Sequence, residues 1–167
     1  MEGSAMGKWT TLCLLVVMAL GGCGSGDSAR VSAAVDAVDP KLRSFYSHSY
    51  AGLDVEDDRL VVYRKPDAAL DAVVREQVDD VDVEFRDAPY SLDELEPLTE
   101  RVRSDWHYWA TRQFPIKSVI PRTDGTGVNV FVATEDLDAA RAEFRQRYGD
   151  QPIVVEHPAR TGIVPVG

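Results

Sequence analysis

The feature that most constrains the fold is an order of hydrophobic patterns that occurs twice along the chain. Apolar positions predict three strands in each occurrence, at residues 50–55, 60–64, 81–86, 116–120, 128–132 and 153–156. In both occurrences a helical pattern lies between the second and the third strand. The chain is therefore predicted to have an α+β fold built from a tandem strand-strand-helix-strand repeat.

Several residues also match between the two occurrences. The tripeptide Leu70-Asp71-Ala72 returns as Leu137-Asp138-Ala139, and Asp57 in the first predicted turn corresponds to Asp124 in the second. The third strands compare as residues 81–84 with residues 153–156. A helix with its neighbouring strands cannot bury its apolar face alone, so we expect the two occurrences to share one sheet and one core.

A longer helix is expected between the two occurrences. Ser91 and Glu94 have the spacing of a capping box. Apolar residues then follow at three- and four-residue intervals, at Leu95, Leu98, Val102, Trp106 and Trp109. Pro97 conflicts with an unbroken helix, because an interior proline costs about 3 kcal/mol. A break near Glu96, or a helix that starts there with Pro97 at its first position, would remove the conflict.

The segment before the first strand gives a weaker pattern. Val31, Val35 and Val38 recur at helical spacing, but alanine, serine and aspartate dilute them. Asp39 and Pro40 fit the N-cap and first turn of a short helix. We therefore divide the chain into a signal peptide, a flexible tether or marginal helix, a single α+β domain and a C-terminal tail, over residues 1–22, 23–39, 40–158 and 159–167.

The N-terminal segment has the organisation of a signal peptide. Lys8 precedes an apolar run from Trp9 to Leu20. The run is too short to span a hydrocarbon core, which needs roughly 20 apolar residues. It therefore predicts a cleavable signal, not a permanent transmembrane helix.

The residues that close this run, Leu20-Gly21-Gly22-Cys23, resemble a bacterial lipobox. A lipobox is the site at which a secreted precursor is lipidated on cysteine and cut just before it. The resemblance implies fatty acylation of Cys23, with palmitate for example. It also implies attachment to the extracytoplasmic face of the cell membrane. The alternative is a plain secretory signal in which Cys23 is incidental.

Composition excludes several classes of function. The formal net charge is −10, which argues against nucleic acid as a partner, because binding there relies on lysine and arginine. Cys13 lies in the leader, so Cys23 is the single cysteine expected in the mature chain. A disulfide framework and a thiolate zinc site are therefore excluded. His48, His107 and His157 lack the spacing of a zinc helix, so no metal or other cofactor is predicted.

The densest aromatic cluster is the run Trp106-His107-Tyr108-Trp109. In one interpretation it is a stacking platform for a sugar or peptide, with His107 as a proton donor. In the other, both tryptophans anchor the core, and His107 and Tyr108 face outward. We take Trp106, His107 and Trp109, together with an exposed sheet edge, as the candidate contacts for a ligand or partner.

Residues 50–62 and Tyr90-Ser91-Leu92-Asp93-Glu94-Leu95 are similar to the pro-regions of secreted bacterial chymotrypsin-like serine proteases. The second occurrence, residues 116–156, also resembles their architecture, and the likeness covers about residues 45–158. Such pro-regions are folding chaperones and inhibitors that pack a sheet against the protease. Because the chain to Gly167 holds no catalytic serine motif, the resemblance implies a fold and not proteolysis.

These observations predict a membrane-anchored extracytoplasmic binding or interaction module without catalytic residues. An extracytoplasmic protein or peptide is the expected partner, with residues 162–166 as a strand-adding tail. The alternative is a small surface hydrolase that uses clustered carboxylates with a histidine.

Overall fold

The computed structural model describes residues 25–78 and 80–158. The signal peptide, Cys23 and the C-terminal tail lie outside the described residues. The helices are α1 (Ser25–Phe45), α2 (Ala68–Gln77), α3 (Leu92–Ser104), α4 (Trp106–Thr111) and α5 (Leu137–Tyr148). The strands are β1 (Tyr50–Glu56), β2 (Arg59–Arg64), β3 (Val83–Asp87), β4 (Ile116–Pro121), β5 (Val128–Val132) and β6 (Ile153–Glu156). The fold is α+β, as predicted.

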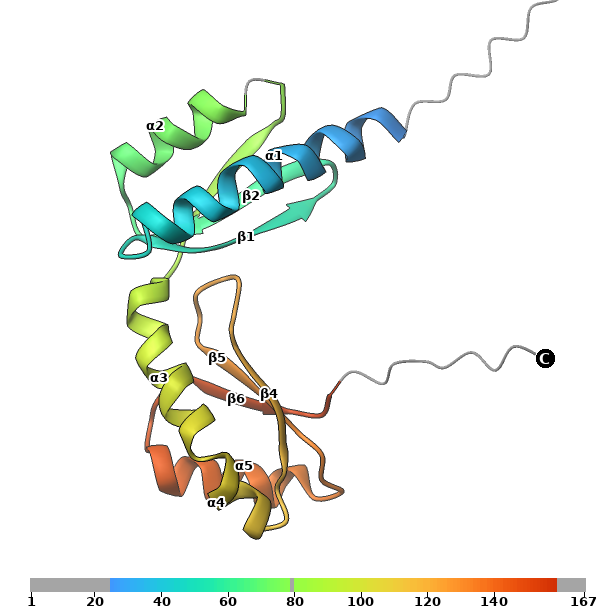
Figure 1. Ribbon diagram of the computed structural model, residues 1–167, viewed down its shortest axis with the longest axis vertical. Coiled ribbons are helices and arrows are strands. Elements are labelled where there is room, and N and C mark those ends of the chain that lie inside the picture. Colours follow the sequence, from blue (N-terminus) through green and yellow to red (C-terminus); the bar gives the residue numbers. More distant parts are fainter. Residues whose placement is uncertain (1–24, 79, 159–167) are drawn as a thin grey trace, which may run out of the picture.

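The first half is a three-stranded sheet covered by two helices. Strand β2 pairs with β1 in antiparallel and with β3 in parallel orientation. Helices α1 and α2 lie on the same face of this sheet (Figure 1). Their apolar residues form a core with strands β1 and β2, from Ala34, Val38, Leu42, Tyr50, Leu60, Val62, Leu70 and Val74.

The second half has the same order of elements after its first helices. Strand β5 pairs with β4 in antiparallel and with β6 in parallel orientation. Helices α3, α4 and α5 cover this sheet (Figure 1). Their core is separate from the first and includes Leu95, Val102, Trp109, Ile116, Val119, Val130, Phe144 and Tyr148.

The predicted single shared sheet is wrong, because each half has a sheet and a core of its own. The expectation assumed that the helix of one strand-strand-helix-strand unit could bury its apolar face only against the other unit. In the structure, α1 packs beside α2 in the first half, and α3 packs against β4 in the second. These additional helices supply the burial that sharing a sheet was expected to provide.

Helix α1 corrects the prediction for the N-terminal part of the domain. The helix is continuous from Ser25 to Phe45, and Pro40 lies inside it instead of in a first turn. Val31, Val38 and Leu42 are buried, so this segment belongs to the first core. The expected boundary at residue 40 therefore falls within a helix, and the helical alternative holds over a flexible tether from Ser25 onward.

The residues that were matched between the halves on sequence do not occupy equivalent positions in the structure. Asp67 caps α2 three residues before the buried Leu70, whereas Asp136 caps α5 directly before Leu137, which is half-buried. In the third strands, Val62 pairs with Phe85 and Val130 pairs with Val155. Phe85 therefore corresponds to Val155, two positions away from the match made on sequence.

The helix between the halves breaks at Asp105 and not near Glu96. The side chain of Glu94 accepts from the backbone N–H of Ser91 at 2.8 Å, which forms that part of the predicted capping box. Pro97 lies inside α3, and the helix continues to Ser104 before α4 begins at Trp106. Neither alternative expected for Pro97 is therefore correct.

A hairpin joins the halves. The turn between β4 and β5 reaches the first half (Figure 1), where the Tyr90 N–H donates to the carbonyl of Gly125 at 3.1 Å. Gly125 has a φ of +66°, and a Cβ there would lie 2.5 Å from the Tyr90 carbonyl oxygen. A Cβ on Gly52 would lie 2.6 Å from the Thr123 carbonyl oxygen. The close fit of the hairpin thus depends on two glycines.

Candidate functional site

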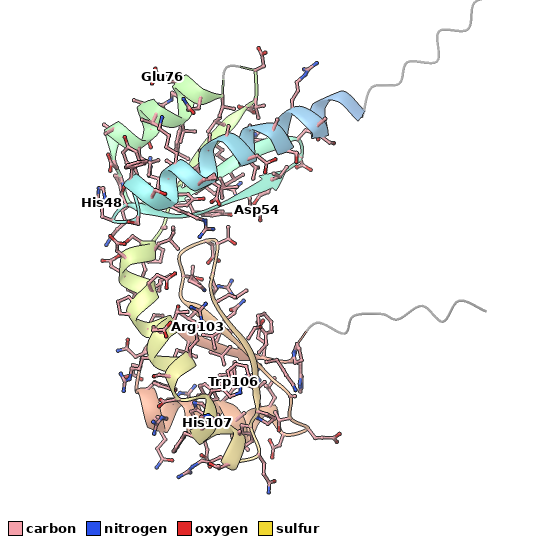
Figure 2. The ribbon with its side chains drawn as sticks, viewed as in Figure 1. His48, Asp54, Glu76, Arg103, Trp106 and His107 are labelled. Carbon is pink, nitrogen blue, oxygen red and sulfur yellow. The ribbon has the colours of Figure 1, made fainter. Side chains whose placement is uncertain are left out.

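The aromatic run that was expected to contact a ligand lies on α4, with one tryptophan facing the core and the other exposed. Trp109 is fully buried, stacks on Phe144 at a centroid distance of 3.8 Å and donates from Nε1 to the Tyr148 hydroxyl at 3.0 Å. Trp106 is 41 % exposed and His107 is exposed, at the end of the second half remote from α1 (Figure 2). Trp106 and Trp109 therefore form no common stacking surface, and Trp109 anchors the core as the structural interpretation expects.

An ion pair beside this run holds the break between α3 and α4. Arg147 donates to both carboxylate oxygens of Asp105, at 2.8 and 2.7 Å, and its guanidinium lies 3.7 Å from the Tyr108 ring centre. The hydrogen bond from Arg147 lowers the pKa of Asp105. Burial raises the pKa of Tyr148, which also donates to Asp105, to about 12. This network fastens α5 to the helix break.

One histidine lies near both a serine and a carboxylate. His48 Nε2 is 3.4 Å from Asp67 Oδ2, and the Ser49 hydroxyl donates to the same oxygen at 2.7 Å. Asp67 also caps α2 by accepting from the backbone N–H of Ala69 and Leu70. The hydrogen bond from Ser49 lowers the pKa of Asp67. Because the serine proton points to the carboxylate and not to the histidine, this cluster has the geometry of a helix cap.

The hydrolase alternative stays a prediction, since no described geometry favours it. Among residues 25–78 and 80–158, no group of three or more histidine, cysteine, aspartate or glutamate residues is placed to hold a metal ion.

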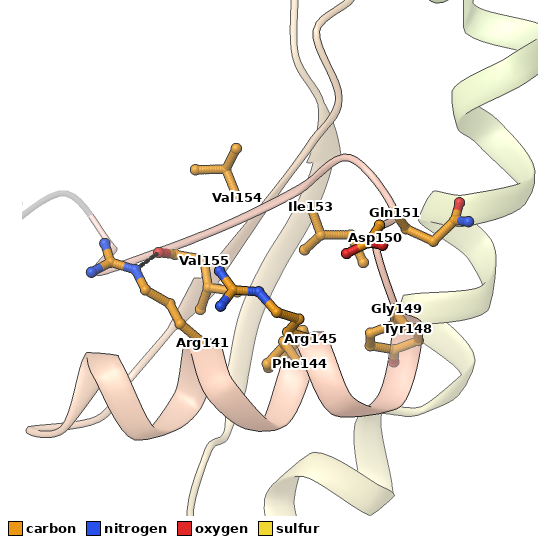
Figure 3. Close-up of a pocket in the computed structure, with 10 residues that line it drawn as sticks. All are labelled: Arg141, Phe144, Arg145, Tyr148, Gly149, Asp150, Gln151, Ile153, Val154 and Val155. Atoms are coloured by element: carbon orange, nitrogen blue, oxygen red, sulfur yellow. Dashed lines mark hydrogen bonds between the residues drawn. The ribbon is translucent and has the colours of Figure 1, made fainter.

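A groove lies between helix α5 and the edge strand β6 (Figure 3). We call it the α5–β6 groove, and its volume is about 390 Å³, within the usual size range of ligand pockets. It is lined by Arg141, Phe144, Arg145, Tyr148, Gly149, Asp150, Gln151, Ile153, Val154 and Val155. Phe144, Tyr148 and Val155 are buried and make its floor apolar.

Two arginines border this apolar floor. Arg141 donates from Nε to the Val155 carbonyl at 3.2 Å (Figure 3) and is 3.2 Å from Asp138. Arg145 is exposed, and within the described part of the chain it has no ion-pair partner. The groove therefore offers a cation beside an apolar surface, in a chain whose net charge is −10.

The backbone of β6 adds a third chemical feature. In the sheet order β4-β5-β6, strand β6 is at the edge, and Val128 donates to the Pro152 carbonyl. Alternate residues of a parallel strand bond to the same neighbour, so the Ile153 carbonyl and the Val155 N–H point away from β5. This edge is the kind of exposed sheet edge that the sequence analysis expected to make contacts.

The corresponding place in the first half is filled. Phe85 occupies the register position of Val155, and its ring lies 4.8 Å from the Arg75 guanidinium and 5.5 Å from that of Arg64. Arg64 is held by Asp71 at 2.9 Å. The smaller Val155 leaves the second half hollow at this point. The sequence did not predict Arg141, Arg145 or Val155 as site residues, because the third strands were matched two residues out of register.

Two smaller hollows flank the hairpin between the halves, with volumes of about 280 and 300 Å³. In the first, Arg122 donates to Asp124 at 3.0 Å and to the Asn129 side chain at 3.2 Å. Although burial opposes ionisation, hydrogen bonds from Arg122 and Thr126 lower the pKa of Asp124 to about 2. Because Arg122 and Asp124 pair with each other, we assign them the structural role of holding the hairpin.

Comparisons with known proteins leave the family of this chain open. No protein-family model matches the sequence, and no curated protein or solved structure matches it. The resemblance to protease pro-regions and the lipobox resemblance therefore stay predictions. None of the helices in the described ranges is long and apolar enough to cross a membrane.

Proposed function

We propose that this protein is a lipid-anchored extracytoplasmic binding module, without catalytic activity, that takes an extended segment of a protein or peptide partner in the α5–β6 groove. The observation that carries the proposal is a combination of three features at one sheet edge: outward backbone groups, an apolar floor, and an arginine, Arg145, that has no ion-pair partner among residues 25–78 and 80–158. The anchor rests on the lipobox-like residues that end in Cys23.

Each feature of the groove selects a property of the partner. The outward Ile153 carbonyl and Val155 N–H match the amide groups of an extended peptide. The floor around Phe144 accepts an apolar side chain. Arg145 provides the donors for a carboxylate, which arginine binds through two parallel hydrogen bonds. An extended acidic peptide therefore fits better than a sugar or a cationic ligand.

The test uses a defined pair of short peptides with alternating valine residues and a central glutamate or glutamine. We expect the glutamate peptide to shift the backbone amide resonances of α5 and β6, and to bind about tenfold more tightly than the glutamine peptide. Arg145→Ser should abolish this preference, because it removes the cation that distinguishes the two peptides.

The first half supplies the matched control. Arg75 follows the buried Val74 on α2 as Arg145 follows the buried Phe144 on α5, and the Phe85 ring fills the space below the Arg75 guanidinium. Arg75→Ser should leave peptide binding and the preference for glutamate unchanged. Resonance shifts confined to other elements, or an equal loss of preference in both variants, would contradict the assignment of the groove.

A further inference from the structure

The position of helix α1 sets the distance between the proposed anchor and the folded core. The helix begins at Ser25, and a single residue, Gly24, separates it from Cys23. Two peptide links therefore connect Cys23 to the first residue of the helix, and two such links reach at most about 8 Å, because consecutive Cα atoms lie 3.8 Å apart. This is far shorter than a flexible linker that would let a domain turn freely.

Helix α1 is also firmly joined to the rest of the first half. Val38 and Leu42 are fully buried against the sheet, and the Tyr50 hydroxyl donates to Asp39 at 2.5 Å. Near the start of the helix, the Ser28 hydroxyl donates to Asp58 in the β1–β2 turn at 3.2 Å. The helix therefore cannot swing on its own without opening the first core.

The second half is attached at the opposite end of this helix. Helix α1 crosses the first sheet, and α3 departs near its C-terminal end (Figure 1). There the Asp93 N–H donates to the Ser47 carbonyl at 3.1 Å. With 21 residues at about 1.5 Å each, α1 separates its two ends by about 31 Å.

We propose that the lipid holds the protein in a fixed orientation, with the N-terminal end of α1 at the bilayer and the second half, including the α5–β6 groove, held away from it. This inference rests on the proposed attachment through Cys23. It explains how a groove on a lipid-anchored chain can stay open to a partner in the surrounding space.

The test measures energy transfer from tryptophan to dansyl-labelled lipid. The chain from Cys23 onward contains every described residue, has a single cysteine, and has both of its tryptophans, Trp106 and Trp109, in the second half. It is coupled through Cys23 to maleimide lipid in vesicles of phosphatidylcholine and phosphatidylglycerol. We expect weak transfer from the parent chain and a severalfold stronger transfer after Ala29→Trp, since Ala29 is exposed near the start of α1.

A linker variant provides the control for orientation. Insertion of a long glycine-serine linker between Gly24 and Ser25 should raise transfer from Trp106 and Trp109, because the second half can then approach the bilayer. Equal transfer from the parent chain and the Ala29→Trp variant, or no effect of the linker, would overturn the proposal. The coupling is chemical, so a failure of lipidation in cells would contradict the anchor and leave this measurement valid.

Discussion

At the scale of single residues, the contact between the halves depends most on Gly125. Gly125→Ala would place a Cβ within 2.8 Å of three atoms of the first half and would force alanine to a φ of +66°. We expect it to lower the free energy of unfolding by about 3 kcal/mol, more than the roughly 1–2 kcal/mol of a left-handed alanine alone. Urea unfolding measures the difference.

Gly149 is the matched control for this prediction. Its φ is +70°, but a Cβ there would meet nothing within 4 Å. Gly149→Ala should therefore cost less than Gly125→Ala, because its backbone (φ +70°, ψ −144°) adds a penalty of about 1–3 kcal/mol without any clash. Equal losses in the two variants would contradict the proposed docking of the hairpin on the first half.

The two tryptophans of the aromatic run make a second residue-scale prediction. Trp109→Ala removes a stacked, fully buried ring and should lower the free energy of unfolding by about 3–5 kcal/mol. Trp106→Ala removes a half-exposed ring and should change it by about 0.5 kcal/mol or less. Calorimetry of both variants tests the assignment, and a large cost for Trp106 alone would contradict it.

The dependence of stability on pH can be derived for Asp124. Its pKa is lowered from 3.8 to about 2 in the folded chain, so its contribution to stability is complete above pH 3.8 and is lost as the pH falls through about 2. Asp124→Asn should reduce the loss of stability on acidification across this range. Asp138→Asn, at a side chain that is 93 % exposed, is the control. Urea unfolding midpoints at several acidic pH values measure this loss. An equal loss in the parent chain and in Asp124→Asn would show that the Arg122 contact does not stabilise the folded chain.

At this scale the sequence predicted core positions better than it predicted the site. The buried strand residues, such as Val62 and Val130, follow from alternation of apolar and polar side chains. The groove depends on the pairing of Phe85 and Val155 with their neighbours, which is a register set by three-dimensional contacts. A one-dimensional match of residue types could not supply that register.

At the scale of elements, helix α1 carries the most specific prediction. Leu42→Ala should lower the free energy of unfolding by about 2–5 kcal/mol, because Leu42 is fully buried in the first core. Phe45→Ala, three residues further along the same helix, removes a ring that is 72 % exposed and should have little effect. If α1 were a tether, chemical denaturation would show no difference between the two variants.

The same helix explains why the element scale was only partly predictable. Its buried positions, Val31, Ala34, Val38 and Leu42, have helical spacing, but alanine contributes little to a hydrophobic pattern. The prediction left α1 out of the first core and so gave the strands there only one covering helix. A sheet shared by both halves was then the consistent prediction. The capping residues of α3, by contrast, act locally, and the helix start was predicted correctly at Ser91.

At the scale of the whole molecule, two halves with separate cores are joined by α3 and by the docked hairpin. The anchor is proposed at the far end of the first half and the binding groove in the second. This arrangement assigns different tasks to halves that have the same order of strands and helices. The first half fixes the orientation, and the second half presents the α5–β6 groove.

The mass of the mature protein tests the central claim, a lipid-anchored chain, most directly. We predict that the membrane fraction of cells that process bacterial lipoproteins contains a chain beginning at Cys23, heavier than its sequence mass by attached acyl groups. The same cells expressing Cys23→Ala should contain no acylated form. A chain recovered from the soluble fraction with Met1 still present and no added mass would contradict the account.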